Sequence, residues 1–203
     1  GVEQTGADDA CAQGHTGDGV TVAVLDTGWD TGHPDLVDRV VAAKDFTGSG
    51  TVQDQVGHGT HVAGTVAGDG SLDESRTGMA PEADLLIGKV LGPNGGQQST
   101  IIEGAEWAVA NGADIVNLSL GSRTPMPCDD PVAEAVSRLG DDALFVISAG
   151  NLSTRGSVTS PGCVEEALTV GAVDPAGDVA SFSSRGAVVD DHRLLSADTN
   201  RLH

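Results

Sequence analysis

Three polar residues, Asp26, His58 and Asn151, lie next to apolar segments and carry the side chains that acyl-transfer chemistry uses. A buried carboxylate can fix the tautomer of an imidazole and stabilise its cation, and the imidazole can then deprotonate a hydroxyl. An Asn amide can donate a hydrogen bond to the oxyanion that forms. Taken alone, an Asp after a strand is more often a turn former or a helix cap, a His at a helix start is more often structural, and an Asn after Gly is usually part of a turn. The chemical interpretation therefore requires that the fold bring them together.

The apolar segments around these residues predict alternating strands and helices. We expect strands over 20–25, 84–91, 113–120, 143–148 and 167–173, and helices over 58–67, 99–110 and 131–139. Ser99 is the expected cap of the second helix, and Asp129 or Asp130 that of the third, which has Pro131 in its first turn. This alternation predicts a three-layer α/β fold with a mostly parallel sheet and helices on both faces. In such folds ligands bind beyond the carboxyl ends of the strands, where Asp26 and Asn151 lie.

Six motifs follow one another along the chain: VAVLDTG, HPDL, HGTHVAGTVAG, NLSLG, SAGN and SFSSRG. With these motifs the chain resembles the subtilisin-like serine proteases, or subtilases, and most of all their secreted bacterial members. The resemblance extends from about Thr16 to about Gly186, and HGTHVAGTVAG is its most specific motif. The interval between Asp26 and His58 also agrees with the family. The resemblance implies a subtilisin-like fold, serine endopeptidase activity and secretion.

The resemblance assigns a role to each matching residue. Asp26 is the expected orienting carboxylate, His58 the general base and Asn151 the oxyanion donor. An extended protein or peptide substrate is expected to bind as an added strand between two edges of the cleft. The residues expected to bind it are Leu91, Gly92, Ser119, Leu120, Gly121, Ala149 and Gly150. The chain's own pro-region is a further expected partner, as an inhibitor.

The resemblance implies no cofactor for the chemistry and allows calcium as a structural ion. Asp35, in the HPDL motif, matches a position that can be a calcium ligand in the family. The nearby acidic loop, 69–77, lacks a clear family calcium pattern. A helix cap or a solvated acid is the alternative interpretation of Asp35.

The chain departs from the family pattern at the nucleophile. Family spacing places the nucleophilic serine about 157 positions after His58, near position 215, and no Gly-Thr-Ser-Met-Ala motif occurs in the 203 residues. Ser181, Ser183, Ser184 and Ser196 lie outside any such motif. We therefore expect a partial peptidase domain over 1–186, incomplete at its C-terminus, and an atypical tail over 187–203. This chain is expected to be catalytically incompetent by itself.

Three other functions fit parts of the pattern. A pseudoprotease would bind peptides through the same substrate edges without cleaving them. A metal hydrolase would use His58 and His61 with Asp26, although the chain lacks the Glu of a zinc-protease helix. The glycine-rich segment 92–100 precedes a helix but lacks the Gly-Lys-Ser/Thr ending of a phosphate-binding loop.

The composition is strongly acidic, with 30 Asp and Glu against 10 Lys and Arg and a net charge of −20. This charge argues against nucleic acid and anionic membranes as partners, because phosphate binding needs clustered cations. We expect salt or divalent cations to increase the stability of such a surface. No segment has the roughly 18 to 20 consecutive apolar residues of a membrane span. The sequence shows no signal peptide, so we expect the chain either to start as a mature form or to be cytosolic.

The chain has three cysteines, Cys11, Cys128 and Cys163. An odd number leaves one thiol free or bonded to another molecule. Cys128 and Cys163 both lie in Pro-containing loops that flank predicted strands, and we hypothesise a disulfide between them. Three reduced thiols are the alternative.

Overall fold

The computed structural model describes residues 1–124, 128–186, 188–190 and 193–195. Its centre is a six-stranded sheet in the order β2-β3-β1-β4-β5-β6, and every neighbouring pair of strands in it is parallel. The strands are β1 (Thr21–Asp26), β2 (Val40–Asp45), β3 (Asp84–Lys89), β4 (Ile115–Leu118), β5 (Leu144–Ser148) and β6 (Leu168–Val170). The predicted α/β class and parallel sheet are confirmed.

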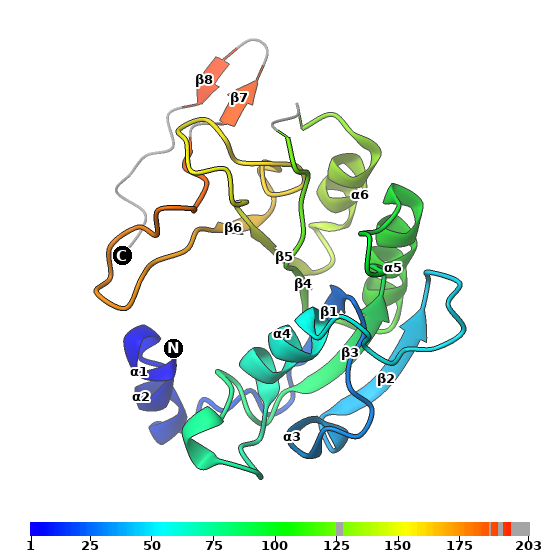
Figure 1. The fold of residues 1–203 in the computed structure, drawn as a ribbon, viewed down its shortest axis with the longest axis vertical. Coiled ribbons are helices and arrows are strands. Elements are labelled where there is room, and N and C mark those ends of the chain that lie inside the picture. Colours follow the sequence, from blue (N-terminus) through cyan, green and yellow to red (C-terminus); the bar gives the residue numbers. More distant parts are fainter. Residues whose placement is uncertain (125–127, 187, 191–192, 196–203) are drawn as a thin grey trace.

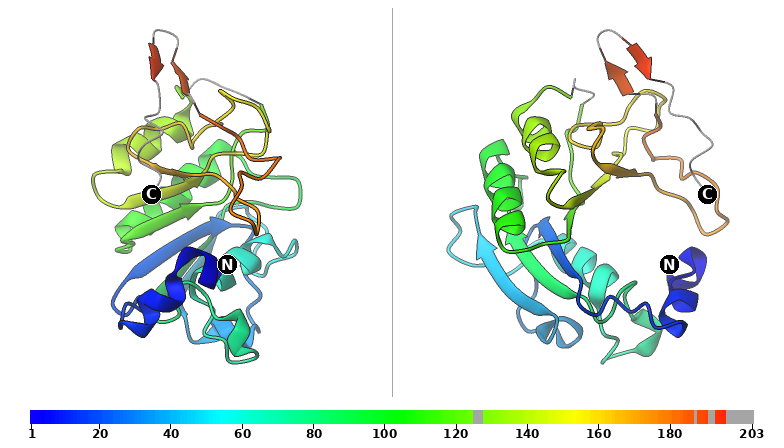
Figure 2. Two further views of the ribbon diagram at one scale, coloured as in Figure 1. Left: turned by 90° about the vertical axis from the view of Figure 1, so that its left-hand side faces the viewer. Right: turned by 180° about the vertical axis from the view of Figure 1, so that it is seen from behind.

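The side chains of β1 alternate between the two faces of the sheet, and each face is covered by helices. Val22 and Val24 pack in one core with helix α4 (His58–Ala67), whose Ala63 is fully buried. Ala23 and Leu25 point to the other face, in the core that α5 (Gln98–Ala110) and, beside it, α6 (Pro131–Leu139) cover. Figures 1 and 2 show α4 on one side of the sheet and α5 and α6 on the other. The sheet is therefore the middle of three layers, and its central strands are apolar on both sides.

The helices test the predicted caps. The structure confirms helix α6 over the predicted range, and the Asp130 side chain caps it by accepting from the backbone N–H groups of Val132 and Ala133. The predicted Ser99 cap is wrong, because α5 begins at Gln98 and Gln97 is the N-cap without a side-chain hydrogen bond. Ser99 therefore lies inside the first turn, where a Ser is tolerated but caps nothing.

The sequence patterns did not predict several smaller elements. These are α1 (Val2–Thr5), α2 (Ala7–Ala12), α3 (Pro34–Val37), strand β2, the 3₁₀ helix η1 (Glu74–Arg76), and the antiparallel pair β7 (Val188–Asp190) and β8 (Arg193–Leu195). Strand β2 is the sheet edge beyond β3, and it contains a register shift between Val40 and Ala42. The predicted division at residue 186 stays a prediction, and positions 187, 191–192 and 196–203 of the predicted tail lie outside the described residues.

The structure confirms the disulfide between Cys128 and Cys163, whose Cα atoms are 5.9 Å apart, and leaves Cys11 as a free thiol. The bridge joins the segment that follows β4 to the segment that precedes β6. Among the described helices, none combines the length and the apolar character that crossing a bilayer requires.

Candidate active site

The sheet brings the predicted site residues to one edge. Asp26 is the last residue of β1, Ser119 directly follows β4, and Ala149 directly follows β5. Because β1, β4 and β5 are neighbouring parallel strands, their carboxyl ends lie at the same edge of the sheet. Strand β3 lies on the other side of β1, and Leu91 comes shortly after its end. The backbone N–H of Leu91 donates to the carbonyl of Asp26 at 3.0 Å. The candidate site therefore lies where ligands bind in open parallel sheets.

Asp26 and His58 are 32 positions apart in the sequence and are in direct contact in the fold. Nδ1 of His58 lies 2.8 Å from Oδ1 and 2.9 Å from Oδ2 of Asp26. The Asp26 side chain is fully buried, whereas 49% of the His58 side chain is exposed. A proton on Nδ1 that is donated to the carboxylate leaves Nε2 of the neutral ring as an acceptor. The arrangement is therefore that of an orienting carboxylate behind an accessible base.

Two opposing effects act on the Asp26 carboxyl. Burial raises its pKa above the usual value of 3.8, and the hydrogen bond and charge of His58, with the N–H of Thr27, act against this rise. The N–H of Thr27 donates to Oδ1 of Asp26 at 2.7 Å. The buried carboxylate thus has two hydrogen-bond partners, the His58 ring and the N–H of Thr27.

Glycine at position 59 allows the start of α4 to approach the end of β1 this closely. A Cβ at Gly59 would collide with the carbonyl oxygen of Gly28. The residue before His58, Gly57, is the helix N-cap and has a φ of 92°, in the left-handed region that favours glycine. Glycine at positions 57 and 59 thus permits the backbone path that places His58 beside Asp26.

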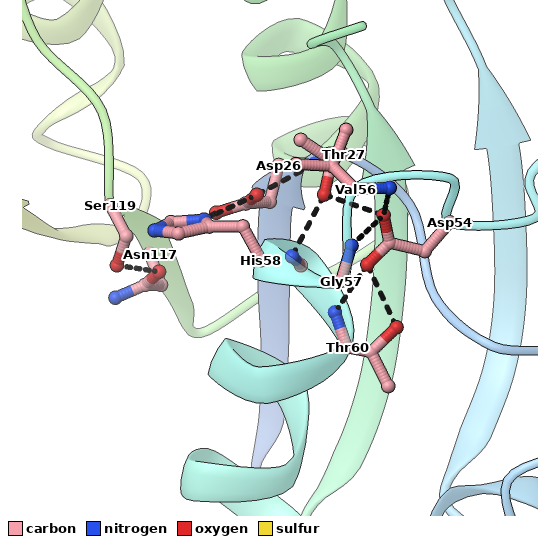
Figure 3. A network of polar contacts seen from close by, with 10 residues as sticks. Asp26, Thr27, Asp54, Val56, Gly57, His58, Thr60, Asn117 and Ser119 are labelled. Carbon is pink, nitrogen blue, oxygen red and sulfur yellow. Dashed lines mark hydrogen bonds and ion pairs between the residues drawn. The ribbon is translucent and has the colours of Figure 1, made fainter. Parts of the chain in front are cut away.

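Asp54, which the sequence analysis did not identify, accepts hydrogen bonds from both sides of His58. Its Oδ1 accepts from the N–H groups of Val56 at 2.9 Å and Gly57 at 2.8 Å. Its Oδ2 accepts from the N–H and the hydroxyl of Thr60, at 2.9 and 2.8 Å. The Thr27 hydroxyl donates to Oδ1 of Asp54 and accepts from the N–H of Gly59 (Figure 3). The only sequence signal was an acidic residue shortly before a helix.

The predicted substrate-binding residues after β4 and β5 lie against each other. The hydroxyl of Ser148 donates to the carbonyl of Leu120 at 3.0 Å. Gly121 and Gly150 both lie close to the side chain of Thr159, because a Cβ added to either glycine would be 2.8 Å from its Oγ1. Thr159, which the sequence analysis missed, is 1% exposed and therefore lies beneath both segments. The structure thus brings Gly121 and Gly150 together over one buried hydroxyl, while Leu120 is held by Ser148.

The remaining predicted residues occupy different surroundings. Asn151 is exposed and lies three residues past the end of β5, and no hydrogen bond joins its side chain to another described residue. Gly92 pairs with Gly95 through two backbone hydrogen bonds, in a tight turn after β3. Ser119 donates its hydroxyl to Oδ1 of Asn117 at 3.0 Å. In Figure 3 these two side chains lie on the side toward which the His58 ring extends.

Asp35, the candidate calcium ligand, and His61, one of the three residues of the metal-hydrolase alternative, line a cavity of about 700 Å³ between α1 and α4, which Gly57 and Thr60 also line. Oδ1 of the buried Asp35 accepts the N–H of Leu72 at 2.8 Å. In the part of the chain that the structure describes, no three His, Cys, Asp or Glu side chains are grouped as metal ligands. His58 is thus paired with Asp26 and not gathered with His61 around a common centre.

Comparison with known proteins agrees with this geometry. A profile of the Peptidase S8 family, described as the subtilase family, matches residues 17–195. Subtilisin Savinase of Lederbergia lenta is 43% identical over 193 residues, covering 94% of this chain and 69% of its own length. An alkaline protease of Alkalihalobacillus alcalophilus is also 43% identical, with 94% and 49% covered. The major intracellular serine protease of Bacillus subtilis is 39% identical over 202 residues, with 94% and 62% covered. The chain thus spans between about half and about two thirds of these relatives.

Proposed function

Because the chain belongs to the subtilase family, we propose that its residues form the base, oxyanion and substrate-binding parts of a serine endopeptidase that cleaves extended peptides. The observation that carries the proposal is the contact between the buried Asp26 and the half-exposed His58 at the carboxyl edge of the sheet. In this role Asp26 holds the proton of His58 on Nδ1, and Nε2 accepts the proton of the attacking serine hydroxyl. His58 then returns that proton to the leaving amine.

The exposed Asn151 amide is proposed to donate to the oxyanion of the tetrahedral intermediate. It follows β5, next to the segment whose backbone the substrate would meet. The substrate would lie as an added strand between the segment 119–121 and the turn that contains Leu91 and Gly92. Ala149 and Gly150 would form a wall of the pocket for the residue before the cleaved bond, with Thr159 beneath it.

We further propose that a polypeptide of these 203 residues alone does not hydrolyse peptide bonds. The hydroxyls of Ser183 and Ser184, both buried, are already engaged with backbone groups. The hydroxyl of Ser119 is donated to Asn117. Among the described serines, none has its hydroxyl hydrogen-bonded to His58. The nucleophile is therefore proposed to lie in a Gly-Thr-Ser-Met-Ala segment that these 203 residues do not contain.

Secretion and two further ligands complete the proposal. The disulfide supports secretion, since such bonds persist mainly in oxidising compartments. The pro-region is proposed as an inhibitor of the substrate cleft. Calcium at Asp35 stays a prediction. Oδ1 of Asp35 accepts the N–H of Leu72, and among the described residues no group of three acidic, His or Cys side chains could hold an ion. Most of the six to eight oxygens that calcium requires would therefore have to be carbonyls or waters. No step of the chemistry depends on this ion.

The test compares three polypeptides on an unstructured protein substrate, each with and without a serine-directed inhibitor. These are the chain itself, a chimera that continues after Gly186 with the C-terminal part of Subtilisin Savinase, and the same chimera with His58→Ala. We expect hydrolysis only by the unmutated chimera, and inhibition of it. Inhibitor-sensitive hydrolysis by the 203-residue chain would show that one of its own serines is the nucleophile. Peptide binding without cleavage by the folded chimera would favour a pseudoprotease.

A further inference from the structure

We propose that Asp54 is a positioning residue that holds the Asp26–His58 pair in its catalytic geometry. The pair joins two separate elements, because Asp26 ends β1 and His58 begins α4. Core packing of Ala63 against Val22 and Val24 places α4 on the sheet. Directional contacts at the first turn of α4 are needed in addition to set the orientation of His58 toward Asp26.

The N-cap residue of α4 provides no side-chain cap for the N-terminus of this helix. Its N-cap is Gly57, which has no side chain and makes no side-chain cap hydrogen bond. The N–H groups of the first turn of a helix have no intrahelical acceptors. Asp54 accepts the N–H groups of Gly57 and Thr60, one before and one after His58 in the sequence. The carboxylate thus performs the capping function from three residues before the N-cap.

Hydrogen bonds through Thr27 link Asp54 to Asp26 and to Gly59, the residue after His58. The Thr27 hydroxyl donates to Asp54 at 2.9 Å and accepts from the N–H of Gly59 at 2.8 Å, and the N–H of Thr27 donates to Asp26. Thr27 is 5% exposed, and its hydrogen bonds to Asp26 and Gly59 are buried, whereas its hydrogen bond to Asp54 is partly buried. A continuous set of hydrogen bonds therefore runs from Asp54 to the residues adjoining both members of the pair.

The loop that carries Asp54 is anchored independently of its carboxylate. The N–H of Asp54 donates to the carbonyl of Trp29 at 2.9 Å, and the N–H of Trp29 donates to the carbonyl of Val52 at 3.1 Å. The buried Lys89 ammonium donates to the carbonyl of Gln53 at 2.8 Å. A change of the Asp54 side chain therefore leaves the backbone anchors of residues 52–54 in place and acts on the contacts of its carboxylate with Val56, Thr27 and the first turn of α4.

Asp54 does not act by touching the reacting atoms. Figure 3 shows the His58 ring extending toward Asn117 and Ser119, while Asp54 lies on the other side of the first turn of α4. Its two oxygens are already occupied by five donors. Its effect on catalysis must therefore pass through the position of His58.

The decisive variant is Asp54→Asn, because the amide nitrogen cannot accept the N–H of Thr60 while the remaining oxygen keeps its contacts. Asp45→Asn is the matched control. Asp45 also accepts from two backbone N–H groups and two hydroxyls of its own loop, and it lies at the end of the edge strand β2. Thr60→Val, which removes one hydroxyl and no charge, is a milder change of the same network.

The readout is the tautomer of His58 in the 203-residue chain, measured from its ring ¹⁵N shifts at alkaline pH, where an imidazole is neutral. We expect the Nδ1–H tautomer in the wild type and in Asp45→Asn, and a mixture of tautomers in Asp54→Asn. A folded Asp54→Asn chain with wild-type shifts would overturn the proposal. If circular dichroism finds Asp54→Asn unfolded, Thr60→Val decides by the same shifts: a changed tautomer ratio supports the proposal and an unchanged one overturns it.

A second readout rests on the proposed function and uses the active chimera. We expect Asp54→Asn to lower kcat about 10- to 100-fold with KM unchanged, as small misplacements of a catalytic group do. A rise in KM at constant kcat would overturn the positioning role, because it would place Asp54 in substrate binding. The NMR experiment needs no activity, so a failure of the proposed function leaves the test of Asp54 intact.

Discussion

Removing the disulfide should destabilise the chain by an amount that its loop length sets. Cys128 and Cys163 are 35 positions apart. In the chain-entropy account, closing a loop of this length removes about 13 cal/mol/K from the unfolded chain, or about 4 kcal/mol at 25 °C. We therefore expect the Cys128→Ala/Cys163→Ala variant to lose about 2 to 4 kcal/mol of unfolding free energy, the usual range for such bonds.

The assay is urea unfolding followed by circular dichroism. With a slope of about 2 kcal/mol/M, the expected loss lowers the midpoint by about 1 to 2 M. The control is Cys11→Ala, which removes the free thiol and closes no loop; its free energy should stay within about 0.5 kcal/mol of the wild type. A double variant within about 1 kcal/mol of the wild type would refute the loop-closure argument.

Three further changes have defined outcomes. Asp130→Ala removes the side-chain cap of α6 and should cost about 1 kcal/mol in urea unfolding; an unchanged midpoint would show that the cap contributes nothing. Asn151→Ala in the chimera should lower kcat about 10²- to 10³-fold without changing the fold, as loss of an oxyanion donor does; unchanged kcat would remove Asn151 from the oxyanion site. Burial alone would raise the pKa of Asp54, but the hydrogen bonds that its carboxylate accepts from N–H and hydroxyl groups lower this pKa to about 2. A carboxyl with a lowered pKa stabilises the fold fully above its usual value of 3.8 and loses this contribution as pH falls toward 2. The difference in unfolding free energy between wild type and Asp54→Asn should therefore be constant above about pH 5 and shrink below pH 3.8. A difference that grows on acidification would contradict the assignment.

Local signals in the sequence predicted several elements well. Helix α6 was predicted over its full range because Asp130 and Pro131 are a cap and a first-turn residue whose preference depends only on neighbouring backbone. The buried strand β1 was predicted one residue from its observed bounds, since a parallel strand covered on both faces is a continuous apolar run. The Cys128–Cys163 bridge was a hypothesis from loop positions, and the structure confirms it.

Other features had no comparable local signal. Strand β2 has alternating exposure and two alanines, and it is a strand because the edge of β3 is available to pair with it. Ser99 has the residue type of a cap, but at the start of α5 it is the hydroxyl of Thr100 that contacts the preceding chain, by donating to the carbonyls of Val90 and Gln97. Thr159 is an ordinary residue in the sequence, and its place beneath Gly121 and Gly150 comes from three chain segments that meet only in the fold.

The sequence alone determined which side chains are available for the chemistry and that an alternating α/β chain would carry them at strand ends, because these follow from residue type and short-range periodicity. Only the tertiary structure decided that Nδ1 of His58 meets both oxygens of a fully buried Asp26. It also decided that Asp54 fixes the start of α4. The physical reason is that hydrogen-bond geometry and burial depend on distances between segments far apart in the chain, and no local preference specifies those distances.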